Sequence, residues 1–395
     1  MLLSLLNIKN YKLFLSNMTF IGMAVAITAP FLVLFTTEVH GITSTQHGIF
    51  LAMIALMSFL VNSVVGRLSD KIPQYRNIII LCSLLCFVFA FMNYLLISNT
   101  LLMIILVILF QGLGAPAMPQ LYAIAREGIN ESHSDRAVLA NTVLRSMFSF
   151  GFLMGPLVGT ILLMKFDYDG LFIGTILLFL VVFVSCLFIK KPNTQFHYST
   201  STHIKSGAPN MFKTKEILLP FIAFVLLHIG QWMYLLNMPL YVKNYLNESA
   251  REVGWLSSAC AGLEVPIMIL LGMLASRLKT MTLLKIGAVV GAIFFISIGI
   301  FESVYAMLIG QIALAFFISV LLGLGISFFQ DLLPDFPGYA STLFSNAMIV
   351  GQFVGNLLGG AMSEWVGLGY VFYVSGSFLI VAFIILLFSK EEVRV

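Results

Sequence analysis

TVLRSMFSFGFLMGPLVGTIL, residues 142–162, and TLFSNAMIVGQFVGNLLGGAM, residues 342–362, are two versions of one apolar segment, offset by 200 positions. Three glycines recur in both versions at the same four-residue spacing: Gly151, Gly155 and Gly159, then Gly351, Gly355 and Gly359. Glycines at this spacing lie on one helical face and leave a groove that a neighbouring helix can enter. We therefore expect a chain of two similar halves, although ordinary packing of small residues would also explain the pattern.

The composition indicates a chain that lies mostly in lipid. Of its 395 residues 60% are hydrophobic and 10% are charged, with a mean hydropathy of +1.02, whereas soluble proteins carry about 25% charged residues. Stretches of ~20 apolar residues, enough to cross a bilayer, recur along the sequence. They predict twelve spans, at 13–37, 47–66, 78–98, 100–125, 138–163, 171–189, 217–242, 253–276, 283–301, 304–329, 340–362 and 370–388.

The longest polar stretch, residues 190–216, contains Lys, Ser, Thr and Pro without apolar periodicity. We interpret it as a cytoplasmic linker between a first lobe, 1–189, and a second lobe, 217–395, with six spans each. The first and seventh spans match more loosely than the fifth and eleventh, with Pro30 opposite Pro239. A duplicated six-span unit is typical of secondary transporters, which bind their substrate between the lobes near the bilayer midplane.

The basic residues fix the expected topology. With the N-terminus in the cytoplasm, 17 of the 21 Lys and Arg fall on cytoplasmic segments, three fall outside and Arg145 lies within a span. The positive-inside rule therefore predicts that both termini are cytoplasmic. The N-terminus lacks a cleavage site and is expected to be retained. This distribution gives no support to a nucleic-acid partner; the lipid bilayer is the expected surroundings.

The sequence excludes several function classes. It contains no nucleotide-binding loop, metal motif or nucleophile elbow, so we expect no enzyme, no metal and no cofactor, with an ion gradient as the energy source. The four cysteines, Cys82, Cys86, Cys186 and Cys260, all fall in predicted spans. We interpret them as small buried apolar residues.

One carboxylate, Glu264, stands in the middle of the apolar stretch 253–275. A charge at this depth is costly, and burial disfavours the ionised form of a carboxylate, so protonation becomes reachable. We predict that Glu264 carries the transported proton and pairs with Arg145 in one state. A permanent structural ion pair, or a hydrogen bond to helix backbone, is the alternative.

Other polar side chains lie within the spans and predict a polar central cavity. His228 can titrate near neutral pH and is a second proton-coupling candidate, although a lone histidine in a helix is more often a hydrogen-bonded structural residue. The substrate-binding candidates are Gln111, Gln120, Tyr122, Gln231, Trp232, Tyr234, Asn237, Gln330, Asn346 and Gln352.

Two motifs resemble those of the major facilitator superfamily. VGRLSDKIPQYRN, residues 65–77, resembles its loop between the second and third helices and marks Gly66, Asp70 and Arg76 as gating residues. We expect Gly66 to permit close helix approach; a purely topological basic loop is the alternative. GFLMGPLVG, residues 151–159, resembles the fifth-helix motif of proton-coupled antiporters. It marks Gly151, Gly155, Pro156 and Gly159 as gating residues, and Pro156 should bend the helix.

Several longer strings resemble the bacterial sugar efflux transporter family: APFLVLF (29–35), AMPQLYAIARE (117–127), NMPLYV (237–242), AGLEVPIMILLG (261–272) and FFQDLLPDFPGYASTLFSNAMIVGQFVG (328–355). The resemblance implies an all-α membrane protein with twelve transmembrane helices in two six-helix lobes of a major facilitator fold. It further implies a proton-coupled exporter of lactose-like sugars or glycosides in the bacterial cytoplasmic membrane. It assigns functional positions to Glu264, Arg145, Gln330 and Asp331. A multidrug or other metabolite exporter on the same scaffold is the alternative, and we expect a monomer.

Overall fold

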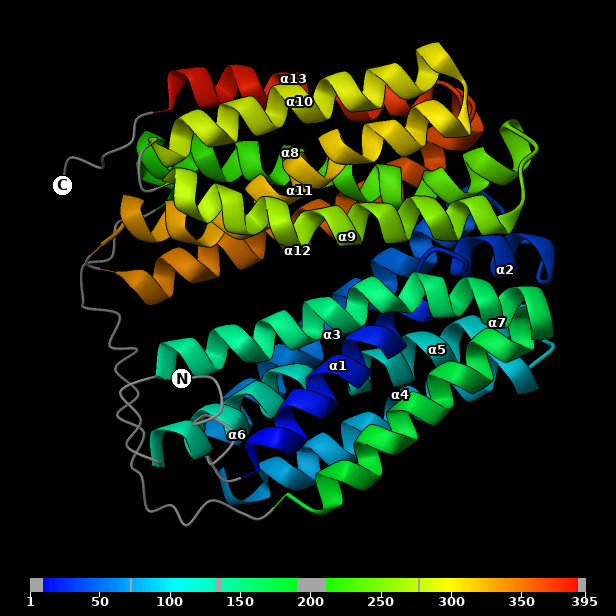
Figure 1. The fold of residues 1–395 in the computed structure, drawn as a ribbon, viewed down its shortest axis with the longest axis vertical. Coiled ribbons are helices and arrows are strands. Elements are labelled where there is room, and N and C mark those ends of the chain that lie inside the picture. The colour runs from blue at the N-terminus through cyan, green and yellow to red at the C-terminus, as the bar shows by residue number, and fades with distance from the viewer. Residues whose placement is uncertain are drawn as a thin grey trace. The chain divides into compact units, whose positions relative to one another are not determined.

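The structure is a computed structural model and describes residues 10–71, 73–131, 137–189, 211–275, 278–334 and 336–389. Those residues form helices and no strands, which confirms the predicted all-α class (Figure 1). The first half contains α1 (Tyr11–Thr28), α2 (Leu32–Glu38), α3 (Ser44–Lys71), α4 (Arg76–Leu96), α5 (Thr100–Gly114), α6 (Ala117–Glu131) and α7 (Ala137–Leu187). The second half contains α8 (Lys215–Leu240), α9 (Ala250–Ala275), α10 (Thr280–Phe301), α11 (Val304–Leu332), α12 (Pro337–Trp365) and α13 (Val371–Phe388).

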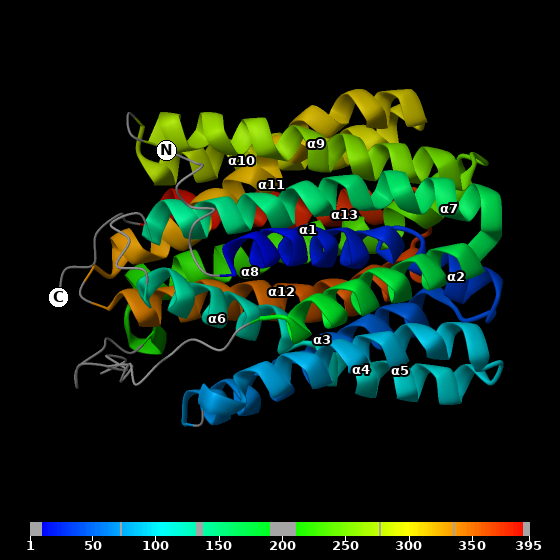
Figure 2. The same cartoon turned by 60° about the horizontal axis from the view of Figure 1, so that its bottom comes forward.

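Ten helical segments within the described residues are long and apolar enough to cross a membrane. Two predicted spans correspond to broken helices, α1 with α2 and α5 with α6, which are interrupted beside Pro30 and Pro116. Proline cannot donate the backbone hydrogen bond that would continue a helix. The long helix α7 contains both the fifth and the sixth predicted spans. The two spans are separate passes, because Asp167 between them has a non-helical backbone (φ 56°, ψ −160°) and the chain reverses there (Figure 2). With α12 counted as well, the twelve predicted spans are all represented by helices.

The helices form two compact units. Unit 1 comprises Met1–His40 and Met53–Phe196, and unit 2 comprises Gly41–Ala52 and His197–Val395. Helix α3 therefore belongs to both units, with residues 44–52 in unit 2 and its remaining turns in unit 1. The predicted linker, 190–216, lies mostly outside the described residues, and α8 begins at its penultimate position, Lys215.

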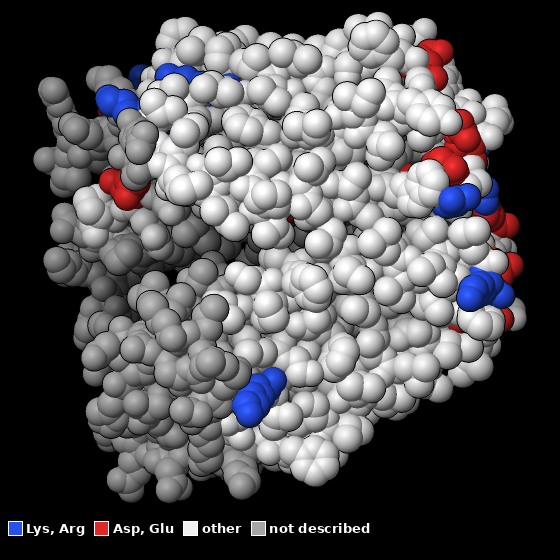
Figure 3. Space-filling view, viewed as in Figure 1, with Lys and Arg blue, Asp and Glu red and all other residues white. Residues whose placement is uncertain are grey.

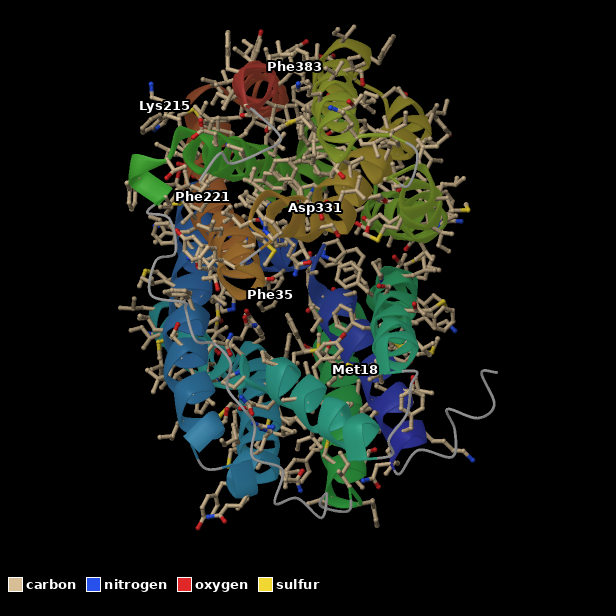
Figure 4. All side chains as sticks on the ribbon, turned by 90° about the vertical axis from the view of Figure 1, so that its left-hand side faces the viewer. Met18, Phe35, Lys215, Phe221, Asp331 and Phe383 are labelled. Carbon is tan, nitrogen blue, oxygen red and sulfur yellow. The ribbon has the colours of Figure 1, made fainter. Side chains whose placement is uncertain are left out.

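Aromatic side chains fill the interior of each unit. In unit 1, Met18 of α1 and Phe35 of α2 are buried (Figure 4). The ring of Phe35 meets Phe172 edge to face, with ring centroids 4.7 Å apart. In unit 2, the ring centroids of Phe224 and Phe329 lie 5.0 Å apart. Charged side chains gather toward helix ends, and most of the described surface in Figure 3 is uncharged, as a lipid-facing surface requires.

The repeated glycines do pack against a neighbouring helix in each half. In unit 1, a Cβ on Gly151 would overlap the carbonyl oxygen of Thr19 on α1, and a Cβ on Gly159 would overlap that of Ile27. In unit 2, a Cβ on Gly355 would come within 2.9 Å of the carbonyl oxygen of Ile229 on α8. Both glycine stripes therefore let two helix backbones touch, as the sequence predicts.

These contacts also correct the alignment of the first and seventh spans. The three glycines of α7 meet Thr19, Met23 and Ile27, and those of α12 meet Val225, Ile229 and Met233, an offset of 206 in each pair. At this offset Pro30 stands opposite Leu236, so its predicted match with Pro239 is wrong by three residues. The matching prolines are a coincidence of composition, whereas the glycine contacts report the packing itself.

Candidate functional site

Glu264 lies in the interior of α9 and is held by its own helix and by a neighbour. The Cys260 thiol, one turn earlier, donates to Oε1 of Glu264 at 3.4 Å. The Ser319 hydroxyl of α11 donates to the backbone carbonyl of Glu264 at 3.1 Å. Pro266, two residues further along, removes one backbone donor from the same stretch of helix. The side chain is half-buried, and among the described residues Cys260 is its only hydrogen-bond partner.

The structure corrects the prediction for the cysteines and does not test the predicted pairing of Arg145 with Glu264. The sequence predicts apolar packing for Cys260; the residue is buried, but its thiol is also the donor to the carboxylate. Cys82, assigned to the same class, is exposed. The Arg145 side chain lies outside the described residues, so its pairing with Glu264 stays a prediction.

His228 is buried on α8 beside Gln231. Its Nδ1 lies 3.1 Å from Oε1 of Gln231. Because a carbonyl oxygen only accepts, Nδ1 carries the proton in this pair. The other ring nitrogen, Nε2, is buried and has no hydrogen-bond partner among the described residues. His228 therefore presents an unused acceptor inside unit 2, where an unpaired polar atom is costly.

Two further candidates on α8 support the packing of unit 2. Asn237 donates to the carbonyl oxygens of Met233 and Gly359, at 2.9 and 3.0 Å, and so links α8 to α12. Tyr234 is only 2% exposed, and its hydroxyl lies 3.4 Å from Nε2 of Gln311 on α11. Both positions are those of residues that hold helices together, and their predicted contact with substrate stays a prediction.

The other substrate-binding candidates divide between the two units. In unit 1, Gln120 is buried and donates to the Ser69 hydroxyl at 2.9 Å. In unit 2, Gln330 donates to the Ser341 hydroxyl at 3.0 Å, and Asp331 beside it is exposed at the end of α11 (Figure 4). The remaining candidates are half-buried: Gln111, Tyr122, Trp232, Asn346 and Gln352.

The loop motif at the end of α3 is only partly as predicted. A Cβ on Gly66 would meet no described atom within 4 Å, so the expected close helix approach is absent there. Ser69 instead closes the helix end by donating to the carbonyl of Gly66 at 2.9 Å. Arg76 is buried at the start of α4, and the side chain of Asp70 lies outside the described residues. The gating roles of these residues stay predictions.

Several functional candidates gave little signal in the sequence. Ser319 and Gln311 come from α11 and reach α9 and α8 only through the fold. Cys260 could have been recognised, because residues four apart on a helix face one another. No group of His, Cys, Asp and Glu within the described part of the chain could hold a metal ion.

Each half of the chain is similar to the same family of known proteins. A sequence model of the Major Facilitator Superfamily matches residues 14–220 and, a second time, residues 220–394. Sugar efflux transporter A of Dickeya chrysanthemi is 30% identical over 353 residues, which cover 87% of this chain and 86% of the relative. Sugar efflux transporter C of Escherichia coli is 29% identical over 380 residues, covering 94% and 93%.

Solved structures of transporters have a similar fold. The nucleoside transporter NupG matches with a TM-score of 0.83 at 13% identity, covering 96% of this chain and 98% of that one. A bacterial homologue of the human lysosomal transporter Spinster matches with a TM-score of 0.72 at 11% identity, covering 96% and 95%. At these identities the similarity concerns the fold alone.

Proposed function

Because this chain belongs to the major facilitator superfamily, and within it to the bacterial sugar efflux transporter family, we propose that it exports sugars or glycosides by alternating access. The two relatives named sugar efflux transporters align with 87% and 94% of this chain and with 86% and 93% of their own length. The protein is a multi-pass membrane protein. We propose that it is a monomer of the bacterial cytoplasmic membrane. The distribution of Lys and Arg supports a cytoplasmic position for both termini.

We further propose that a proton gradient, rather than a bound cofactor, drives export through Glu264. The observation that carries this proposal is the one carboxylate of the apolar stretch 253–275, whose side-chain partner, among the described residues, is a neutral thiol. A carboxylate held by a neutral donor can take up and release a proton without breaking an ion pair. A permanently ion-paired carboxylate would instead have to lose its partner first.

The substrate side of the proposal rests on side chains that can hydrogen-bond to sugar hydroxyls. Planar amides such as Gln352 and Asn346 can each engage two hydroxyl groups, and the Trp232 ring offers an apolar face for a sugar ring. All three side chains are half-buried within unit 2. A lactose-like disaccharide or a thiogalactoside is the substrate class we propose.

The test is transport into proteoliposomes with an imposed pH gradient, using radiolabelled lactose and a β-thiogalactoside. The wild-type protein should accumulate sugar only with the gradient, whereas Glu264→Gln should exchange sugar across the membrane without accumulating it. Glu248→Gln is the matched control, because Glu248 is an exposed carboxylate in the turn before α9.

Each alternative has its own outcome. If neither sugar moves but a cationic dye does, the protein is a drug exporter on the same scaffold. If Glu264→Gln concentrates sugar as the wild type does, Glu264 is structural and the coupling site must be sought at His228 or Asp331.

A further inference from the structure

Three helical segments meet at one end of unit 2. Glu302 follows α10, Tyr370 precedes α13, and Tyr245 closes the π-helical turn Tyr241–Tyr245 that continues α8. All three residues stand at the end of an apolar span or next to it, and α10 and α13 lie side by side (Figure 1). In a bilayer such positions lie at the level of the lipid headgroups, where aromatic side chains are enriched.

Glu302 is an exposed carboxylate with a tyrosine hydroxyl as its partner. The Tyr245 hydroxyl donates to Oε1 of Glu302 at 2.8 Å. Among the described residues it is the only hydrogen-bond partner of this side chain, and no described basic side chain forms an ion pair with it. A carboxylate has about four acceptor sites, so most of the acceptor capacity of Glu302 is available to a ligand.

Tyrosine rings gather beside this carboxylate. Tyr245 stacks on Tyr241, with ring centroids 4.8 Å apart and 16° between the ring planes. The ring centroids of Tyr370 and Tyr373 lie 6.2 Å apart, and both residues are close enough to Tyr245 for an electrostatic interaction. Tyr245 is 42% exposed and Tyr370 is 66% exposed. We call Tyr245, Glu302, Tyr370 and Tyr373 the tyrosine–carboxylate cluster, which is thus accessible from the surface.

The helix ends do not by themselves require these side chains. Glu302 has a left-handed backbone (φ 42°, ψ 42°), the conformation in which helices commonly end and which glycine adopts without steric cost. The turn therefore gives no reason for a carboxylate at this position. Gly369 lies against Tyr245, since a Cβ there would come within 3.2 Å of the Tyr245 ring and hydroxyl. The absence of a side chain at Gly369 leaves room for the tyrosine that holds Glu302.

An ammonium group fits these features better than other headgroup chemistry does. The face of an aromatic ring attracts a cation, and a primary ammonium can donate hydrogen bonds to the carboxylate of Glu302. An anionic headgroup would be repelled by the same carboxylate. A headgroup that carries only hydroxyls could form hydrogen bonds but would gain no cation–ring attraction.

We propose that the tyrosine–carboxylate cluster is a binding site for a phospholipid with an ammonium headgroup, such as phosphatidylethanolamine. The occupant is a lipid and not a soluble amine, because the cluster stands where three membrane spans end and therefore faces the headgroups of the bilayer. The site lies entirely within unit 2 and involves no transported sugar. It is thus independent of the export function proposed above.

The test is native mass spectrometry of the full chain, which counts the lipids that stay bound when the protein is released from detergent micelles. Phosphatidylethanolamine and phosphatidylglycerol with the same acyl chains are titrated separately. The variants are Glu302→Gln, which keeps an acceptor for the Tyr245 hydroxyl but removes the charge, and Tyr370→Leu, which removes an exposed ring. The controls are Asp169→Asn and Tyr75→Leu, which remove an exposed carboxylate and a 48% exposed ring from unit 1.

The wild-type protein should bind phosphatidylethanolamine more tightly than phosphatidylglycerol. Glu302→Gln should weaken the binding of phosphatidylethanolamine about fivefold, which is the upper end of the range for a surface ion pair. Tyr370→Leu should weaken it about two- to fivefold, because one cation–ring attraction is lost. Both control variants should bind the two lipids as the wild type does.

Three results would overturn the proposal. Equal binding of the two lipids by the wild type would show only a general aromatic belt at the membrane surface. A preference that persists unchanged in Glu302→Gln would place lipid recognition elsewhere. Displacement of the lipid by free ethanolamine at the same concentration would show a site for the amine itself. Because the comparison of lipids on the wild type needs neither a variant nor a sugar, it decides about the site even if a variant fails to fold or the proposed substrate is wrong.

Discussion

Two Gly→Ala substitutions in the first half should have opposite effects on stability, and their contrast tests the packing directly. At Gly151 of α7 a new Cβ would overlap the backbone carbonyl of Thr19. Overpacking costs typically 1–3 kcal/mol, and since a backbone atom cannot change rotamer, we expect about 3 kcal/mol here. Alanine recovers about 1 kcal/mol through its higher helix propensity. The net loss should therefore be about 2 kcal/mol, or roughly 4–8 °C in the unfolding midpoint.

At Gly66 of α3 the same substitution meets no described atom within 4 Å. Only the gain in helix propensity from Gly to Ala is left, which adds at most about 1 kcal/mol to the free energy of unfolding. The unfolding midpoint should therefore stay unchanged or rise by a few degrees. All three tryptophans (Trp232, Trp255 and Trp365) lie in unit 2 and do not report on unit 1. The suitable assay is temperature-dependent thiol labelling of Cys186, which is fully buried in unit 1, with its modified peptide quantified by mass spectrometry.

Two results would refute this reasoning. A Gly151→Ala protein as stable as wild type would mean that α1 and α7 do not touch through their backbones. A Gly66→Ala protein destabilised as much as Gly151→Ala would mean that Gly66 does face a close neighbour, as the sequence alone suggested.

Three further outcomes follow from the geometry of unit 2. Cys260→Ala should shift the pH dependence of sugar accumulation in proteoliposomes and Cys260→Ser should largely restore it, whereas a purely apolar role for Cys260 predicts the same profile for both. Tyr234→Phe should lower the free energy of unfolding, followed by tryptophan fluorescence, by about 1 kcal/mol, the value of one hydrogen bond, and leave the KM for sugar unchanged; a raised KM would place Tyr234 in the substrate site. Hydrogen bonds from Thr43, Ser44 and Thr45 lower the pKa of Glu364 in the folded protein more than partial burial raises it. The contribution of Glu364 to the free energy of unfolding should therefore be fully present above the ordinary glutamate pKa of about 4.3 and should be lost as the pH falls through the lowered pKa. The difference in free energy of unfolding between wild type and Glu364→Gln should follow that course, and a difference that does not shrink as the pH is lowered below about 4.3 would contradict it.

The sequence could predict the features that depend on local composition. Apolar length predicted all twelve spans, and the gap between the fifth span, 138–163, and the sixth, 171–189, contains Asp167, where the backbone of α7 is non-helical. The glycine stripe of α7 was visible because its spacing is a property of one helix. The partner of a glycine is not such a property, so Gly151 and Gly66 looked equally suited to close packing, and only the fold shows that a neighbour faces one of them.

The candidate site was less predictable, because its contacts join separate helices. Glu264 stood out as a lone carboxylate in an apolar stretch, a cost that packing alone does not explain. Nothing near it in the sequence pointed to Ser319, which lies 55 residues later. Cys260 differs, because its spacing of four residues from Glu264 is visible in the sequence, but the same spacing fits a cysteine that only packs among apolar residues.

The register of the two halves shows where they have diverged. The glycine contacts place Phe31 of the first half opposite Asn237 of the second, and Gly22 opposite His228, each at the offset of 206. At the offset of 200, Pro156 stands opposite Asn356, which is 1% exposed and has both amide atoms unpartnered among the described residues. At these positions an apolar or glycine residue in unit 1 is replaced by a polar one in unit 2.

Buried polar atoms without partners are costly, so these replacements do not serve stability. Glu264, whose partner is a thiol of its own helix, lies in the same half as Glu364, which accepts a hydrogen bond from the backbone N–H of Thr45. The backbone contacts that hold helices together have stayed alike in both halves, which is what a shared fold requires. At the three positions compared, the hydrogen-bonding side chains of His228, Asn237 and Asn356 occur in unit 2 only, so the second half departs there from the apolar scaffold that the first half keeps.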